Sequence, residues 1–173
     1  MALERLYRPN VRCDLYGPEA FANRNAPTAA ELNSAILGYN VTCALWEDDT
    51  EFTLGDPDMD DGLTYCSAAA ISTPTFDNPT VTFTALRDKT RKATGTTGAD
   101  GVFNGTFERL AWADREYIAV NRVGFASDVA YATTQKIRMV SVKTDIPIDV
   151  VSSGENARIQ QVFLPNGWVN WGY

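Results

Sequence analysis

The residues best able to do chemistry are the carboxylates of one short segment, residues 47–61, called the acidic segment below. It holds eight acidic residues and no Lys or Arg: Glu47, Asp48, Asp49, Glu51, Asp56, Asp58, Asp60 and Asp61. The rest of the chain has 14 acidic and 15 basic residues, a net charge of +1, so the segment accounts for the formal net charge of −7. Because crowded like charges destabilise a folded chain, these side chains are expected to lie in water, on a metal ion or opposite a partner's cations.

Metal binding is the first chemistry that the acidic segment suggests. Residues 56–62 resemble the first half of a calcium-binding EF-hand loop. However, the sixth loop position, which needs glycine for a sharp turn, is Asp61, and the twelfth, which needs a bidentate Glu, is Ser67. The sequence therefore predicts no EF-hand and no dedicated metal site, while weak binding of a divalent ion by the clustered carboxylates stays open.

Other catalytic patterns are missing from the sequence. The chain contains no histidine, which excludes Ser-His-Asp and Cys-His relays and histidine-ligated metals. Cys13, Cys43 and Cys66 form no CxxC pair and are odd in number, which argues against a disulfide framework and a zinc site. We therefore predict no enzyme, no catalytic residue and no cofactor, with a hydrolase acting through carboxylates as a minor alternative.

Basic residues form two small clusters, neither of which predicts a nucleic-acid site. Arg5, Arg8 and Arg12 are spaced along the start of the chain, and Lys89, Arg91 and Lys92 precede a glycine-rich stretch at residues 95–101. That stretch matches neither the dinucleotide fingerprint nor a phosphate loop. An acidic protein is also a poor general binder of DNA, since affinity depends on neutralising phosphates.

The elements that must position these residues are mostly strands. At 173 residues the chain has the length of one domain, with no apolar run long enough to span a membrane and no signal-peptide pattern. Residues 1–25 are expected to form an extended N-terminal arm outside the core. Thr28 and Glu31 fit a capping box, which predicts a helix of two or three turns that ends at Gly38.

Strand patterns follow at residues 41–46, 64–71, 81–85, 117–123, 137–142, 146–151 and 159–164. The first two flank the acidic segment and predict a long hairpin with the acids near its tip, protruding over residues 47–63. One amphipathic helix is predicted, with Thr106 as N-cap and an apolar stripe through Phe107 and Leu110 to Asp114. The expected fold is mainly β, a β-sandwich or small β-barrel with one packed α-helix and a long extended hairpin loop.

The aromatic C-terminus, residues 167–173, is expected to pack on its own barrel, with packing on a neighbour as the alternative. An alternative function from a different class uses the same aromatics. In it, the chain is a β-sandwich binding module whose acidic loop holds a divalent ion and whose Trp46, Trp168 and Trp171 bind a saccharide.

Several patterns together carry a family resemblance: residues 26–33 leading to residues 41–45, Tyr65-Cys66, Pro74-Thr75 before residues 81–86, Arg87-Asp88, and residues 117–123. In these the chain resembles siphophage major tail proteins, the tail tube subunits, of the kind found in phages of actinobacteria. The resemblance covers most of the chain and implies one tail-tube-like domain over residues 1–173.

The resemblance further implies a structural virion protein of the phage tail, assembled in the host cytoplasm. Six copies would close into a ring, and stacked rings would form the tube through which the genome is ejected. The implied partners are other copies of the chain, the tape measure, tail terminator and distal tail proteins, and viral DNA in transit without specific binding; no membrane is implied.

Two roles for the acidic segment follow from that resemblance. In the first, the segment reaches a neighbouring ring and meets Arg5, Arg8 and Arg12 or Lys89, Arg91 and Lys92 of another copy. In the second, some of its acids face the lumen and repel DNA over a screening length of about 8 Å. Both roles can hold for different residues.

Overall fold

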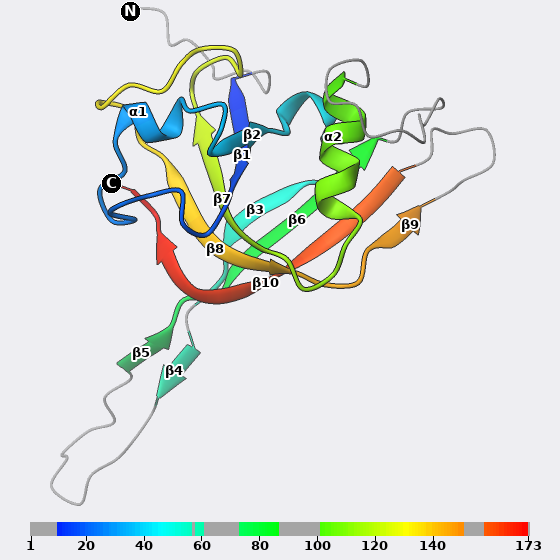
Figure 1. The fold of residues 1–173 in the computed structure, drawn as a ribbon. Coiled ribbons are helices and arrows are strands. Elements are labelled where there is room, and N and C mark those ends of the chain that lie inside the picture. Colours follow the sequence, from blue (N-terminus) through cyan, green and yellow to red (C-terminus); the bar gives the residue numbers. More distant parts are fainter. Residues whose placement is uncertain (1–9, 57, 61–72, 87–100, 151–157, 173) are drawn as a thin grey trace, which may run out of the picture.

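The computed structural model describes residues 10–56, 58–60, 73–86, 101–150 and 158–172, and the account below is confined to them. Strands and helices follow one another along the chain in the order shown in Figure 1. They are β1 (Val11–Tyr16), α1 (Ala29–Leu32), β2 (Gly38–Asn40), the 3-10 turn η1 (Thr42–Ala44), β3 (Glu51–Leu54), β4 (Asp58–Asp60), β5 (Thr73–Phe76), β6 (Pro79–Leu86), α2 (Gly101–Leu110), β7 (Glu116–Val123), β8 (Arg138–Thr144), β9 (Ile148–Val150) and β10 (Arg158–Asn170).

Eight of the strands form one antiparallel sheet, which confirms the mainly β fold. The order across the sheet is β2-β1-β7-β8-β10-β6-β3, and β9 pairs with β10 beside this path. The two remaining strands, β4 and β5, pair with each other as a separate ribbon that projects away from the main sheet in Figure 1. The long connection between β3 and β6 therefore leaves the body of the protein and returns to it.

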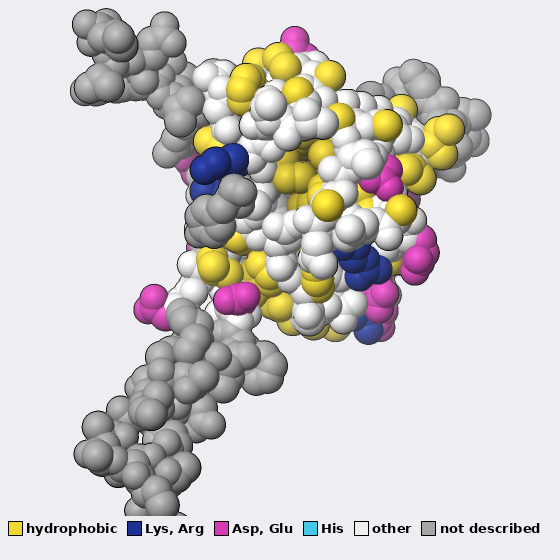
Figure 2. All heavy atoms as spheres, turned by 90° about the vertical axis from the view of Figure 1, so that its left-hand side faces the viewer, with side chains coloured by type: hydrophobic (Ala, Val, Ile, Leu, Met, Phe, Trp, Pro, Cys, Tyr) yellow, Lys and Arg dark blue, Asp and Glu magenta, His cyan; other side chains and the backbone are white. Residues whose placement is uncertain are grey.

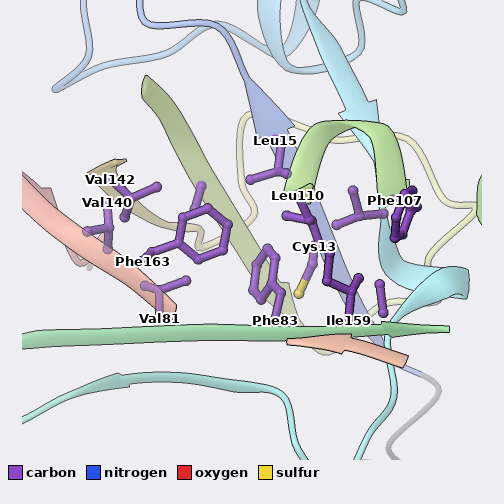
Figure 3. Packing of buried hydrophobic residues seen from close by; sticks show 13 residues of the cluster. Cys13, Leu15, Val81, Phe83, Phe107, Leu110, Val140, Val142, Ile159 and Phe163 are labelled. Carbon is purple, nitrogen blue, oxygen red and sulfur yellow. The ribbon is translucent and has the colours of Figure 1, made fainter. Parts of the chain in front are cut away.

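The sheet curls, so that strands far apart in its order share one core. Cys13 and Leu15 of β1 lie in the same buried cluster as Phe83 of β6 and Phe163 of β10. The rings of Phe83 and Phe163 pack edge to face, with their centres 5.2 Å apart. Figure 3 shows both side chains within the cluster. Helix α2 contributes Phe107 and Leu110 to this cluster and covers it. Burial of each of the Phe83 and Phe163 rings contributes about 2 kcal/mol, so the cluster stabilises the curled sheet.

The chain between β2 and β3 links the two ends of the curled sheet. The Val41 amide donates to the Cys13 carbonyl oxygen on β1 at 3.0 Å, and the Trp46 amide donates to the Thr84 carbonyl oxygen on β6 at 2.6 Å. Between them, Leu45 forms an isolated bridge with Ala85. This crossing satisfies backbone groups at both ends and helps α2 to close the open side of the core.

A second buried cluster lies on the opposite face of β1, β7 and β8. Side chains alternate along each strand, so Tyr16, Ile118, Val120 and Met139 face away from the first cluster. The chain between β1 and α1 covers them with Ala20 and Phe21, helped by Leu32 of α1 and by Tyr131 of the β7–β8 loop. These three strands are therefore buried on both faces.

Three expectations about the N-terminal half need correction. Residues 11–16 do not stand outside the core as part of an arm, because β1 pairs with both β2 and β7 and buries Cys13 and Leu15. The capping box of Thr28 and Glu31 is present, but α1 has only four residues, because Asn33 caps it and binds Tyr131 of the β7–β8 loop. Residues 41–46 contain the 3-10 turn η1 instead of a strand.

The predicted helix is displaced toward the N-terminus. α2 covers Gly101–Leu110, so Thr106 lies buried within it instead of capping it, and Asp114 follows its end with a positive φ of 63°. The apolar stripe through Phe107 and Leu110 was predicted correctly, but the helix begins at Gly101, the last residue of the glycine-rich stretch. Packing on the core outweighs the low helix propensity of glycine there.

Strand predictions were more accurate in the C-terminal half. Residues 117–123, 137–142, 146–151 and 159–164 correspond to β7, β8, β9 and β10, although β10 continues to Asn170. Its register against β8 shifts between Pro165 and Val169, which lets the strand carry a proline. The aromatic end is thus part of the sheet.

Candidate functional site

The acidic segment does not form a single loop. Glu47, Asp48 and Asp49 lie between η1 and β3, while Glu51 belongs to β3, an edge strand of the main sheet. Asp56 follows β3, and Asp58 and Asp60 lie on β4, at the start of the projecting ribbon (Figure 1). Asp61 lies outside the described residues. The described acids therefore divide between the turn before β3, β3 itself and the start of the ribbon, and the predicted placement of acids near the tip of the hairpin stays a prediction.

Asp49 of the acidic segment makes hydrogen bonds within its own chain. Asp49 Oδ2 accepts a hydrogen bond from Arg158 Nη1 at 3.2 Å, and the same guanidinium lies over the Trp46 ring at 4.9 Å. The Asp49 carbonyl oxygen also accepts from the Thr84 hydroxyl at 3.0 Å. These contacts fix the turn before β3 against β6 and β10, so Asp49 serves the fold.

Two further acids of the segment make contacts with residues of their own chain. Glu51 Oε1 accepts from the neighbouring Thr53 hydroxyl at 2.8 Å, and the Asp56 carbonyl oxygen accepts from Asn78 Nδ2 at 3.0 Å. Figure 2 shows acidic side chains at several separate places on one face of the molecule, among hydrophobic and uncharged ones. Within the described ranges, no group of three or more acidic or thiol side chains is arranged to hold a metal ion.

Of the six basic residues expected to face acids of a neighbour, only Arg12 lies in the described part. Its Nε donates to Asp14 Oδ2 at 2.7 Å, its Nη1 donates to the Val129 carbonyl oxygen at 3.1 Å, and its guanidinium lies 4.5 Å from the Tyr131 ring centre. Arg12 is thus engaged within its own chain. Arg5, Arg8, Lys89, Arg91 and Lys92 lie outside the described residues.

Arg12 belongs to a buried polar network that the sequence analysis missed. Arg122, opposite Arg12 across the β1–β7 pair, is fully buried, and its guanidinium lies 4.8 Å from the ring centre of Tyr131. It donates to the carbonyl oxygens of Ala126, Val129 and Ala130 at 2.7, 2.9 and 3.3 Å, and to Gln135 Oε1 at 3.0 Å. The guanidinium of Arg122 thereby holds the β7–β8 loop in one conformation.

Asp14 supplies the negative charge of this network. Its Oδ2 accepts from the Tyr131 hydroxyl at 2.5 Å as well as from Arg12, while its Oδ1 is buried without a hydrogen bond. Burial raises the pKa of Asp14, opposed by the Tyr131 hydrogen bond and the charge of Arg12. Burial also raises the pKa of Tyr131, so its hydroxyl stays protonated and keeps donating. The only sequence signal was an acid between Arg12 and Tyr16 in an otherwise strand-like run.

The tryptophans considered as a saccharide platform are engaged within the chain. Trp171 stacks on Phe52 with ring centres 5.7 Å apart and lies under Arg138 at 5.2 Å. Trp168 packs against the second buried cluster, and its Nε1 donates to Asn25 Oδ1 at 3.2 Å. With Trp46 under Arg158, these rings have the contacts of structural side chains. Trp168 and Trp171 thus pack on their own chain, and Tyr173 lies outside the described residues.

Apart from Leu54 and Trp112, the exposed large apolar side chains of the described residues lie in two regions. One region lies on β9, β10 and the turn before β9, and the other at the end of β7, on the β7–β8 loop and on the turn after α1. Exposed apolar groups of this kind mark surfaces that bind other macromolecules more often than they mark catalytic sites. Among the described residues, no helix has both the length and the apolar character needed to cross a membrane.

Comparison with known proteins agrees with an assembly role. A search of curated proteins finds no match to this chain. A family model described as phage tail tube protein matches residues 4–170, which include every described strand and both helices. This match, nearly the full length of the chain, assigns a structural component of the phage tail that associates with copies of itself and with other tail proteins. The chain belongs to the phage tail tube protein family.

Proposed function

We propose that six copies of this chain close into a ring and that such rings stack into the hollow tube of a siphophage tail, through which the genome is ejected. The observation that carries the proposal is the family match over residues 4–170, combined with a curled antiparallel sheet and a projecting ribbon. The whole chain acts as one tail-tube domain. It is assembled in the host cytoplasm and meets the tape measure, terminator and distal tail proteins at the tube's interior and ends.

Two kinds of contact are needed to build a tube. A head-to-tail contact that closes makes a ring, and a second contact along the axis stacks one ring on the next. We assign the stacking contact to the β4–β5 ribbon. An isolated two-stranded ribbon is marginally stable in water, and this one stands away from the main sheet, so contact with a neighbouring subunit is expected to stabilise it.

The position of the acids supports different roles for different residues. Asp58 and Asp60 lie on β4 and would travel with the ribbon to a neighbouring ring, where cations of another copy can pair with them. Glu51 lies on the edge strand of the main sheet, with its side chain exposed, and is the better candidate for a lumen-facing charge that repels DNA. Asp49 pairs with Arg158 of its own chain, so we assign neither role to it.

Electron microscopy of the concentrated, purified protein tests the assembly itself. Rings or tubes are expected, and a protein that stays monomeric at high concentration would refute the proposal. The role of the ribbon acids is tested by a variant carrying Asp56→Asn, Asp58→Asn, Asp60→Asn and Asp61→Asn. Bridging predicts loss of tubes, while lumen lining predicts intact tubes with slower passage of DNA.

A matched control separates a site-specific effect from a change in net charge. Glu19, Glu116, Asp128 and Asp149 are exposed acids outside the acidic segment. Converting these four to their amides removes the same charge, and this variant is expected to form tubes as the unmodified chain does. If the control and the acidic-segment variant behave alike, the acidic segment has no special role and is simply solvated.

A further inference from the structure

The first exposed apolar surface lies where β9 meets β10. Ile148 of β9 pairs with Gln160 of β10, and directly opposed residues in antiparallel strands point to the same face. Val162 and Leu164 follow Gln160 at intervals of two, so their side chains share the face of Ile148, and Ile146 lies exposed in the turn just before β9. Their exposed fractions run from 40% to 75%. Ile146, Ile148, Val162 and Leu164 are called the β9–β10 patch below.

The second surface lies on the β7–β8 loop and the turn that follows α1. It consists of Ile36, Leu37, Val123, Phe125 and Val129, exposed by 39% to 95%, and is called the loop patch. Two hydrogen-bonded contacts hold its two segments side by side. Asn33 exchanges hydrogen bonds with the backbone of Tyr131, and Asn40 Nδ2 donates to the Ser127 carbonyl oxygen at 3.2 Å.

The loop patch is rigidly supported although its side chains lie in water. The buried guanidinium of Arg122 binds three backbone carbonyl oxygens of the loop, and Arg12 binds one of the same three. Burying a cation is costly, and here the contacts it makes fix a loop that exposes Phe125 and Val129 to solvent. A loop preorganised in this way binds a partner without first losing conformational entropy.

The two patches match in size and lie on opposite sides of the molecule. Each exposes on the order of 400 Å² of apolar residues, about half of the ~800 Å² per partner buried in a standard stable interface and as large as the biggest patch of a typical monomer. In Figure 1, β9 lies at one side of the sheet, while α1 and the β7–β8 loop lie at the other. With the two patches on opposite sides, each copy can contact one neighbour through its β9–β10 patch and another neighbour through its loop patch.

We infer that the β9–β10 patch of one copy packs against the loop patch of the next copy. This inference rests on the proposed ring and names the contact that closes it. The contact is heterologous, since the two patches differ, and repetition of a heterologous contact produces a ring when the rotation between copies closes. The occupant of each patch is thus a second copy of the same chain.

The test uses two variants that each destroy one patch. The first carries Ile146→Asp and Ile148→Asp, and the second carries Ile36→Asp and Phe125→Asp. All four side chains are exposed, so the substitutions bury no charge in the monomer. A variant that carries Leu54→Asp and Trp112→Asp, which places the same two charges on exposed apolar residues outside both patches, is the matched control. Circular dichroism checks the fold, and sedimentation velocity with electron microscopy measures assembly.

Each patch variant alone is expected to stay monomeric, and the control is expected to form rings. An equimolar mixture of the two patch variants is expected to give dimers and nothing larger, because one intact β9–β10 patch can meet one intact loop patch. Rings from either variant alone would overturn the inference while leaving the proposed function standing. Dimers from one variant alone, or a mixture that stays monomeric, would also overturn it. An unmodified chain that never assembles refutes the proposed function instead.

Cross-linking decides the matter if a patch variant fails to fold. In a background of Cys43→Ser and Cys66→Ser, one preparation carries Ile146→Cys and another carries Ile36→Cys. A short bismaleimide applied to co-assembled rings is expected to join the two preparations to each other. Cross-links within one preparation but not between the two would exclude the head-to-tail contact.

Discussion

Removing the charge of Arg122 should release the β7–β8 loop and unfold it locally. Arg122→Met keeps most of the buried aliphatic volume but removes the donors to Ala126, Val129, Ala130 and Gln135. Each hydrogen bond from a charged group contributes about 1.5–3 kcal/mol, but the freed carbonyl groups can turn to water once the loop opens. Loop opening therefore limits the loss, and we expect a decrease of about 3–5 kcal/mol in the free energy of unfolding, as for other broken buried ion networks.

Urea denaturation measures the free energy of unfolding, and hydrogen exchange of the amides at residues 126–135 reports the loop directly. Arg138→Met is the matched control, because Arg138 is half-buried and lies 5.2 Å from the Trp171 ring, a contact expected to contribute less than about 1 kcal/mol. If Arg122→Met lowers stability by no more than this control, or leaves loop exchange unchanged, Arg122 does not hold the loop. The loop patch would then not be preorganised by the Arg122 guanidinium.

Three further predictions concern the core and its edges. A Cβ at Gly105 of α2 would overlap the Tyr39 hydroxyl, so Gly105→Ala is expected to lower the free energy of unfolding by about 1–3 kcal/mol, while Gly17→Ala, with open space around it, is expected to be nearly neutral. Burial raises the pKa of the Cys13 thiol from 9.0 to about 12, so between these pH values the folded chain keeps a proton that the unfolded chain releases. The free energy of unfolding should therefore fall between pH 9 and 12, by up to about 1.4 kcal/mol per pH unit. Cys13→Ala should make this fall less steep. In a Cys66→Ser background, Ellman's reagent should label Cys43 at once and Cys13 only on unfolding, and rapid labelling of both thiols would contradict the burial of Cys13.

The strands that could be predicted are those whose partners are ordinary apolar neighbours. β6 reads Pro79–Leu86 with period-two alternation, and β7 and β8 have long β-branched runs, so local pattern and tertiary environment agree. β1 was missed because Arg12 and Asp14 break its pattern. Their charges neutralise each other, and Asp14 also accepts a hydrogen bond from Tyr131, more than a hundred residues away, a partner that no local pattern contains.

The structure of the acidic segment could not be predicted from its own residues. Glu51 and Asp58 begin strands although acidic residues have low strand propensity, because β3 pairs with β6 and β4 pairs with β5. The sequence showed that the negative charge is concentrated in this segment and that the spacing of its acids does not match an EF-hand loop. It could not show that the segment divides between an edge of the main sheet and a separate ribbon, since that division depends on pairing with strands further along the chain.

The two kinds of contact that a tube requires are assigned to different parts of the subunit. In Figure 1, β9 lies at one side of the sheet and the β7–β8 loop lies at the other, and the ribbon leaves the sheet in a direction that is separate from both. Contacts made by apolar burial depend weakly on salt, whereas contacts made by exposed charges weaken as ionic strength rises. Raising the salt concentration should therefore separate stacked rings before it opens them, and tubes that dissolve directly into monomers would show that closure and stacking share one surface.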